Sequence, residues 1–103
     1  MLKTEFIDRT GYCPTDCEYH NVIEPEYYNY PFGKDEFCHH WLLEQLHTLR
    51  ERAAKYETML RNGHRLTQAT LDTLRSIHEA QHTFNKHLIF LHNKIYGNSE
   101  NNK

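Results

Sequence analysis

The stretch that decides the fold is residues 35–95, DEFCHHWLLEQLHTLRERAAKYETMLRNGHRLTQATLDTLRSIHEAQHTFNKHLIFLHNKI. Apolar side chains recur in it at alternating steps of three and four residues, on both sides of Asn62-Gly63. This spacing keeps one side of an α-helix apolar and is typical of coiled coils and other antiparallel helix pairs. The seam residues are Leu42, Leu46, Leu49, Ala53, Tyr56, Leu60, Leu74, Ile77, Phe84, Leu88, Leu91 and Ile95. We therefore expect two long helices folded back on each other.

Residue types at the ends of the two arms predict where each helix begins and ends. Gly63 tolerates the left-handed conformation found just past a helix end, so it predicts a turn near residues 62–66. Asp35 is predicted to cap the first arm. Thr67 is predicted to cap the second by accepting a hydrogen bond from a free backbone N–H, and Gly97 is expected to close it.

The chain before the hairpin carries weaker signals. Residues 1–14 look short and irregular. Thr15 and Glu18 fit a capping box, a threonine cap followed by an acid three residues later, which predicts a short helix over about residues 16–28. Pro25 lies inside that span, so we expect the helix to kink or stop at the preceding residue.

The segment that joins this short helix to the hairpin, residues 27–33, is rich in aromatic rings. Tyrosine has a large apolar face and a polar tip, so we expect the loop and the short helix to pack on the open end of the hairpin. The predicted fold is all-α. It consists of an N-terminal segment (residues 1–34), a long antiparallel helical hairpin (residues 35–96) and a disordered tail (residues 97–103).

Composition narrows the class of protein. A chain of 103 residues makes one small domain with a modest core. Its net charge of −2 provides no basic field, so nucleic acid is not an expected partner. No apolar run approaches the roughly 18 residues that span a bilayer, and three cysteines make no disulfide framework. We therefore expect a cytoplasmic protein without a membrane partner.

Further apolar side chains lie outside the seam. A two-helix hairpin buries about one stripe on each arm, so a second stripe needs another partner. The additional residues are Leu43, Ala54, Met59, Leu71, Ala80, Ile89, Phe90 and Tyr96. We expect the short helix to cover part of them and self-association or a target protein to cover the rest. The simplest form of self-association is a homodimer in which a two-fold axis pairs two hairpins antiparallel.

A run of short motifs covers roughly the first 41 residues. The residues concerned are Phe6-Ile7, Thr10-Gly11, Pro14-Thr15, Glu18-Tyr19, Ile23-Glu24, Tyr27, Lys34-Asp35, Phe37-Cys38 and Trp41. This run resembles the opening of small uncharacterised proteins encoded by bacteriophages and prophages. The resemblance implies a phage setting, in the host cytoplasm, where such proteins often bind host or defence components. The spacing in residues 41–95 also looks like that of the helical cores of phage proteins that sequester cyclic nucleotides.

Three cysteines and a histidine form a candidate metal site. Zinc takes four Cys or His ligands in a tetrahedron, and such a site would tie the N-terminal segment to the hairpin. The candidate ligands are Cys13, Cys17, Cys38 and His39, with His20 and His40 as alternatives. The C-x3-C spacing is uncommon for zinc, so the favoured interpretation is thiols that are buried or idle, with no cofactor.

Histidine and glutamate also recur at metal-binding spacings within the two arms. His78, Glu79 and His82 match H-E-x-x-H, but the third histidine of the zinc-protease motif is missing. Glu44-x-x-His47 and Glu79-x-x-His82 place one Glu-x-x-His motif on each arm, as in carboxylate-bridged di-iron bundles. These residues flank the seam instead of lying in it. The favoured interpretation is therefore solvated side chains, and a metal-binding protein is only the third functional hypothesis.

Tyrosines and arginines are the candidate ligand-binding residues. Tyr27, Tyr28 and Tyr30 belong to the aromatic loop, whereas Arg61 and Arg65 lie in the basic turn. Arginine suits phosphate groups and tyrosine suits stacking. The two groups lie at opposite ends of one hairpin, so we expect them to share a site only in an antiparallel dimer.

The leading functional expectation is a small non-catalytic binding protein. It would act by protein–protein contact, as a homodimer, to interfere with or regulate an unknown host protein. The alternative is an oligomeric anti-defence protein that sequesters a nucleotide ligand. No catalytic residues are expected, because the residues show no nucleophile–base pattern and no phosphate-binding glycine-rich loop.

Overall fold

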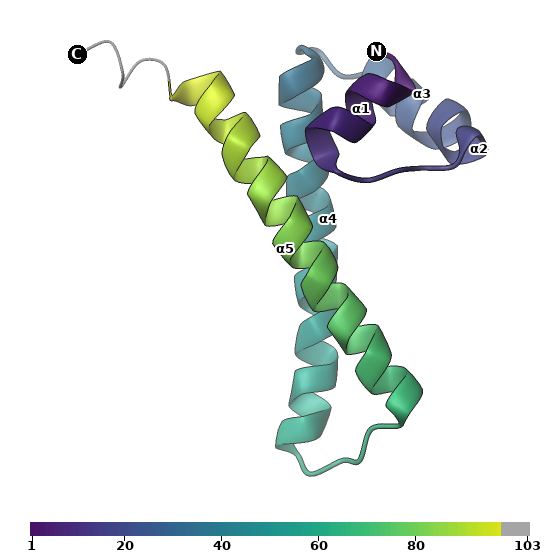
Figure 1. Ribbon diagram of the computed structural model, residues 1–103, viewed down its shortest axis with the longest axis vertical. Helices are drawn as coiled ribbons and strands as arrows, with labels where there is room; N and C mark the ends of the chain where they lie inside the picture. The colour runs from purple at the N-terminus through teal and green to yellow at the C-terminus, as the bar shows by residue number, and fades with distance from the viewer. Residues whose placement is uncertain (98–103) are drawn as a thin grey trace.

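A computed structural model gives the structure of the chain and describes residues 1–97. Within that range the fold is all-α, as predicted. The elements are α1 (Lys3–Thr10), α2 (Asp16–Glu18), the π-helical turn η1 (Tyr19–Ile23), α3 (Glu24–Tyr28), α4 (Lys34–Arg61) and α5 (Gln68–Tyr96). Figure 1 shows α4 and α5 as two long arms, with the short helices packed near the end away from their connecting loop. None of the described helices is long and apolar enough to cross a membrane.

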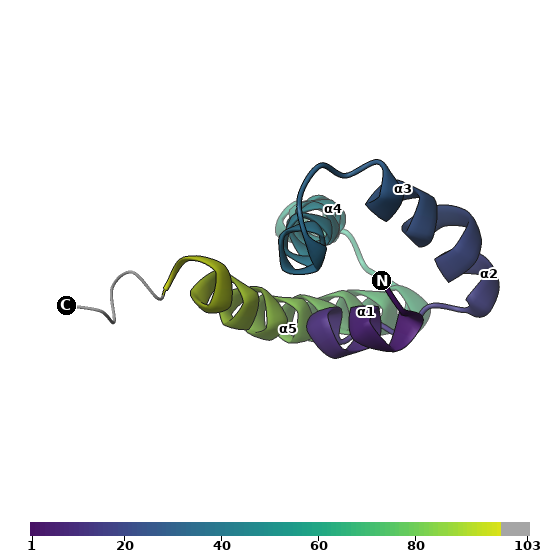
Figure 2. The ribbon, with the colours of Figure 1, turned by 90° about the horizontal axis from the view of Figure 1, so that it is seen from above.

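The predicted hairpin is confirmed, but its arms cross instead of running side by side. Figures 1 and 2 show α5 passing obliquely over α4 and diverging from it towards the open end. The seam is buried best towards the open end, where the N-terminal helices cover it. Leu42 and Leu91 are fully buried, whereas Leu60, near the turn, is 44% exposed.

The helix ends follow the predicted signals in part. Gly63 adopts a left-handed conformation (φ 85°), and the Thr67 hydroxyl accepts a hydrogen bond from the Thr70 N–H at 3.2 Å. The prediction that Asp35 caps α4 is wrong. The capping position is Gly33, two residues earlier, and the Asp35 carboxylate instead contacts Arg9 and Lys94.

The second arm ends at the predicted glycine without a left-handed residue. The Gly97 N–H donates to the carbonyl of Asn93 at 2.8 Å with a φ of −74°, so Gly97 itself keeps a right-handed helical conformation. The predicted disordered tail lies, beyond Gly97, outside the described residues.

The predicted short helix forms and continues past Pro25 to Tyr28. Thr15 caps it, accepting a hydrogen bond from the Glu18 N–H at 3.1 Å. Of the two expected outcomes at Glu24, a kink or a stop, the stop does not occur. The Glu24 N–H instead reaches back five residues to the carbonyl of Tyr19, which makes η1 a π-helical turn. Proline has no N–H and its ring crowds the preceding turn, so a widened turn just before Pro25 lets the helical path continue.

The sequence predicted no helix in residues 1–14, yet α1 is part of the core. Its Phe6 side chain is fully buried and lies edge-on to Trp41, with ring centroids 4.9 Å apart. The buried Thr10 hydroxyl donates to the Phe6 carbonyl at 2.9 Å, which satisfies its polar group inside the helix. Thus α1 contacts both arms of the hairpin where they diverge (Figure 2).

The core has two parts. The larger cluster lies at the open end of the hairpin and the smaller one lies nearer the turn. The large cluster consists of Phe6, Tyr19, Ile23, Phe37, Cys38, Trp41, Leu42, Leu46, Phe84 and Leu91. The small cluster consists of Ala53, Leu74 and Ile77. The N-terminal helices therefore complete the open end, where two crossing arms alone leave their aromatic residues uncovered.

Gly11 ends α1 in a left-handed conformation and lies close to α5. Its φ is 74°, and a Cβ there would lie 2.6 Å from Cε1 of His87 on α5. We expect Gly11→Ala to lower the free energy of unfolding by about 1–3 kcal/mol, through backbone strain and this clash. Gly63→Ala is the matched control, because Gly63 also has a positive φ but no atom near the added Cβ. Urea unfolding followed by circular dichroism measures both, and equal losses would contradict a clash with His87.

Candidate functional site

A cleft opens where the start of α4 faces the end of α5. It encloses about 340 Å³ at the end of the molecule where the two arms diverge. Its walls come from the aromatic loop and from both long helices. The lining residues are Tyr30, Phe32, Glu36, His39, His40, Leu43 and Tyr96. Seven side chains from three segments therefore form one concave surface, which we take as the candidate functional site.

Aromatic rings define the walls of this cleft. The Tyr30 ring stacks on the His40 imidazole with centroids 5.5 Å apart, and it lies 5.7 Å from the Phe32 ring. On the far side, His39 lies 5.8 Å from His92, and His92 lies 5.0 Å from Tyr96. Ring faces of this kind suit a planar or cationic group.

Glu36 gives the cleft its charge. Among residues 1–97 its carboxylate makes no ion pair and no hydrogen bond, whereas His40 is already paired with Glu44. Burial and the neighbouring imidazoles of His92 and His40 lower the pKa of His39, so that ring is neutral at pH 7. The cleft thus presents a negative charge among aromatic rings.

The candidate ligand-binding residues do not gather in one chain. Tyr30 lines the cleft, whereas Tyr27 packs on Phe37 and Tyr28 is 70% exposed. Arg61 and Arg65 are exposed beside the loop at the opposite end of the hairpin (Figure 1). The geometry of one chain therefore keeps tyrosines and arginines apart, and nucleotide binding at a shared site remains a hypothesis that requires a second copy.

The candidate zinc ligands are also not brought together. Cys13 and Cys17 are exposed, but Cys38 is buried in the core with its Sγ 3.9 Å from the Met1 Sδ. Burial raises the pKa of the Cys38 thiol to about 12, which opposes the thiolate that zinc requires. Across residues 1–97, no three His, Cys, Asp or Glu side chains are grouped to hold a metal ion, and the fourth candidate, His39, faces the aromatic cleft.

The Glu44 and His47 side chains of the α4 motif pair with partners one turn away instead of with each other, whereas Glu79 and His82 of α5 make no ion pair among residues 1–97. Glu44 contacts His40 and not His47, which bonds instead to Glu51 at 2.7 Å. His78 reaches across the arms to Glu57 at 3.4 Å. These side chains are half or more exposed, so the Glu-x-x-His spacing here belongs to solvated pairs on the helix surface.

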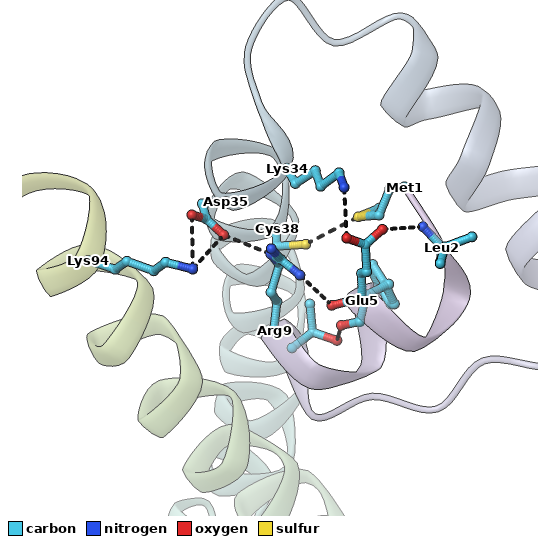
Figure 3. Close-up of polar contacts among 10 residues, drawn as sticks. Met1, Leu2, Glu5, Arg9, Lys34, Asp35, Cys38 and Lys94 are labelled. Atoms are coloured by element: carbon cyan, nitrogen blue, oxygen red, sulfur yellow. Dashed lines mark hydrogen bonds and ion pairs between the residues drawn. The ribbon is translucent and has the colours of Figure 1, made fainter.

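A polar network fastens α1 to both arms on the other side of α4 (Figure 3). The Arg9 guanidinium donates to the Asp35 carboxylate at 2.7 Å, and Lys94 of α5 approaches the same group at 3.3 Å. Lys34 donates to Glu5 at 2.7 Å. This network positions the first turn of α4 and therefore the cleft residues that follow it.

The sequence indicated three residues of the cleft, but for different sites. Tyr30 was a candidate for ligand binding and His39, with His40 as an alternative, for zinc, whereas Phe32, Glu36 and Tyr96 were not proposed as site residues. The sequence did contain one signal for this cleft. Leu43 and Tyr96 belong to the apolar residues outside the seam, and both line the cleft.

The fold and cleft define a small all-α helical-hairpin protein with an N-terminal helical cap. No family model, no curated protein and no solved structure matches the chain. Its function therefore has to be inferred from its own residues.

Proposed function

We propose that this protein is a non-catalytic binding protein that acts as a homodimer through protein–protein contact. The observation that carries the proposal is the amount of apolar surface on the hairpin that one chain leaves uncovered. Large hydrophobic side chains of both arms are 40–68% exposed. They are Leu43, Leu60, Leu71, Ile89, Phe90 and Tyr96.

The open shape of the molecule supports the same proposal. The accessible surface is 7306 Å², whereas a compact monomer of 12.4 kDa exposes about 6,100 Å². The radius of gyration is 16.5 Å, against about 13 Å for a compact chain of this length. The surplus of about 1,200 Å² exceeds the roughly 800 Å² that one partner contributes to a stable interface.

Ile89 and Phe90 supply the most exposed apolar pair on α5. They are 61% and 68% exposed and border a hollow of about 470 Å³. Asp8, Lys86 and Asn93 form its polar rim. An apolar centre with a polar rim is the usual composition of a protein-binding surface, so we propose this pair as the contact for a target protein. The resemblance of the first 41 residues to phage proteins makes a host component the proposed target.

Sedimentation velocity at tens of micromolar tests the dimer, and we expect a species of twice the chain mass. A monomer at that concentration would overturn the homodimer.

Affinity capture from a bacterial lysate then compares the wild-type chain with Ile89→Asp. We expect a protein that the wild-type chain captures to be lost with Ile89→Asp and kept with Arg52→Asp, a control at an exposed position on α4. Equal capture by both variants would exclude this pair as the contact.

A further inference from the structure

One face of α4 carries an exposed stripe that is distinct from its seam with α5. All but one of its members come one position after a residue of the seam, and the remaining one, Glu36, lies seven residues before Leu43. This spacing places the stripe about 100° around the helix from the seam. The stripe consists of Glu36, Leu43, His47, Arg50, Ala54, Glu57 and Arg61. All of them are exposed except Glu36, which is half-buried in the wall of the cleft.

The two ends of the stripe carry opposite charges. Glu36 lies at the open end and Arg61 lies at the turn, 25 positions later, or about 37 Å along the helix. Within the described part of the chain neither side chain has an ion pair. One helix face therefore carries an unpaired acid at one end and an unpaired base at the other.

We propose that two copies of this chain pair antiparallel along this stripe, so that Arg61 of each copy enters the aromatic cleft of the other and pairs with Glu36. This proposal rests on the homodimer proposed above and specifies its interface. It assigns the cleft a guanidinium group as its ligand.

The register of the stripe fits a two-fold axis. When Glu36 faces Arg61 of a second copy, Leu43 faces Ala54 of that copy, because both pairs are symmetric about the point between Thr48 and Leu49. The two copies of the charge pair then lie outside the two copies of the apolar pair, and His47 faces Arg50 of the other copy on both sides of the axis. An isologous interface requires this kind of self-complementarity.

The cleft is chemically suited to arginine. The Glu36 carboxylate can accept two hydrogen bonds from a guanidinium, and the rings of Tyr30, Phe32 and Tyr96 provide faces for cation–π contact. Because the pKa of His39 is lowered, no imidazolium charge there repels the incoming cation at neutral pH. The His40 imidazole is already in contact with the Glu44 carboxylate.

The arrangement also agrees with helix-bundle packing. The seam places α5 on one side of α4, and the stripe places a second α4 about a quarter-turn away, as neighbouring helices lie in a four-helix bundle. The N-terminal helices do not obstruct this approach, since the stripe residues beyond the cleft are exposed. The proposed dimer therefore leaves the Ile89–Phe90 surface of α5 free for another protein.

Reciprocal charge reversal tests the pairing. In Glu36→Arg the proposed interface opposes two arginines at each end, and in Arg61→Glu it opposes two glutamates. We expect each variant alone to dimerise at least about tenfold more weakly than the wild type in sedimentation equilibrium. An equimolar mixture of the two variants restores opposite charges at both ends, so we expect it to form a heterodimer with wild-type affinity.

Matched controls separate this effect from net charge and folding. Glu79→Arg and Lys55→Glu make the same charge changes on other faces, and we expect them to dimerise like the wild type. Arg50 lies beside its own symmetry mate near the proposed axis, so Arg50→Ala should strengthen the dimer severalfold. Circular dichroism verifies that each variant is folded.

The outcomes distinguish this interface from the dimer itself. A wild-type dimer that neither charge reversal weakens would overturn the α4 pairing while leaving the homodimer intact. Variants that dissociate but do not recover on mixing would also overturn the antiparallel register. A wild-type monomer would overturn both proposals.

Discussion

Replacing Phe6 by alanine is expected to lower the free energy of unfolding by about 3–5 kcal/mol. Phe6 has no exposed surface, and its ring packs against Trp41 of α4 and, with centroids 6.2 Å apart, against Tyr19 of η1. Removing the ring leaves a cavity between three elements that cannot close without moving α1. The loss would be a large part of the stability of a domain of this size.

Urea unfolding, followed by helical circular dichroism, measures this loss. Ile7→Ala is the matched control, because Ile7 is the next residue in α1 and is only partly buried. We expect its cost to be clearly smaller. If both substitutions cost the same, α1 would be lying on the surface of the hairpin instead of completing its core.

Replacing Asp35 by alanine is expected to cost about 2 kcal/mol at neutral pH. Its carboxylate, 24% exposed, joins α4 to Arg9 of α1 and Lys94 of α5 (Figure 3). Hydrogen bonds to charged groups contribute roughly 1.5–3 kcal/mol, and removing the acid leaves the partly buried Arg9 without its partner. Glu79→Ala is the control, since Glu79 is exposed and makes no ion pair among residues 1–97.

Acid should reduce the cost of this substitution. Burial of Asp35 opposes its ionisation, but the hydrogen bonds from Arg9 and Lys94 outweigh it and hold the pKa of the carboxyl below its usual value. The hydrogen bond from Lys34, with that from the Leu2 N–H, lowers the pKa of Glu5 to about 2. Because both pKa values are depressed by folding, the stability from these acids is fully present above about pH 4.5 and is lost as the pH falls towards 2.

The measurement is urea unfolding of the wild type and Asp35→Ala at pH 7 and at pH 2.5. We expect the wild type to lose more stability than the variant on acidification, so that the two converge. A difference that stays constant between the two pH values would show that Asp35 stabilises the fold by packing alone.

Local sequence signals were sufficient for the two long helices. The spacing of three and four residues, the left-handed Gly63 and the Thr67 cap act within a few turns of one helix, so they can be recognised without a partner. The same signals were insufficient for α1. It has eight residues, too few to be stable alone, and owes its helical form to the burial of Phe6 between elements distant in sequence.

The residues of the cleft could likewise not be grouped into one site from local sequence signals. Tyr30, Glu36 and Tyr96 come from a loop and from opposite ends of the hairpin, and they meet only because α4 and α5 cross at an angle. The crossing depends on Trp41 and Phe84, whose rings lie 5.7 Å apart, and on the N-terminal helices beside them. A helical period specifies which face is apolar, but it does not specify the angle at which two such faces pack.

The sequence alone determined an all-α hairpin with its turn at Gly63, and more apolar surface than one hairpin can bury, because periodicity and chain length are local properties. Only the tertiary structure decided that α1 completes the core, that Asp35 serves an ion-pair network instead of a helix cap, and that Glu36 lies among aromatic rings. Each of those outcomes depends on side chains brought together by packing across 25 or more residues of the chain, and no spacing pattern records it.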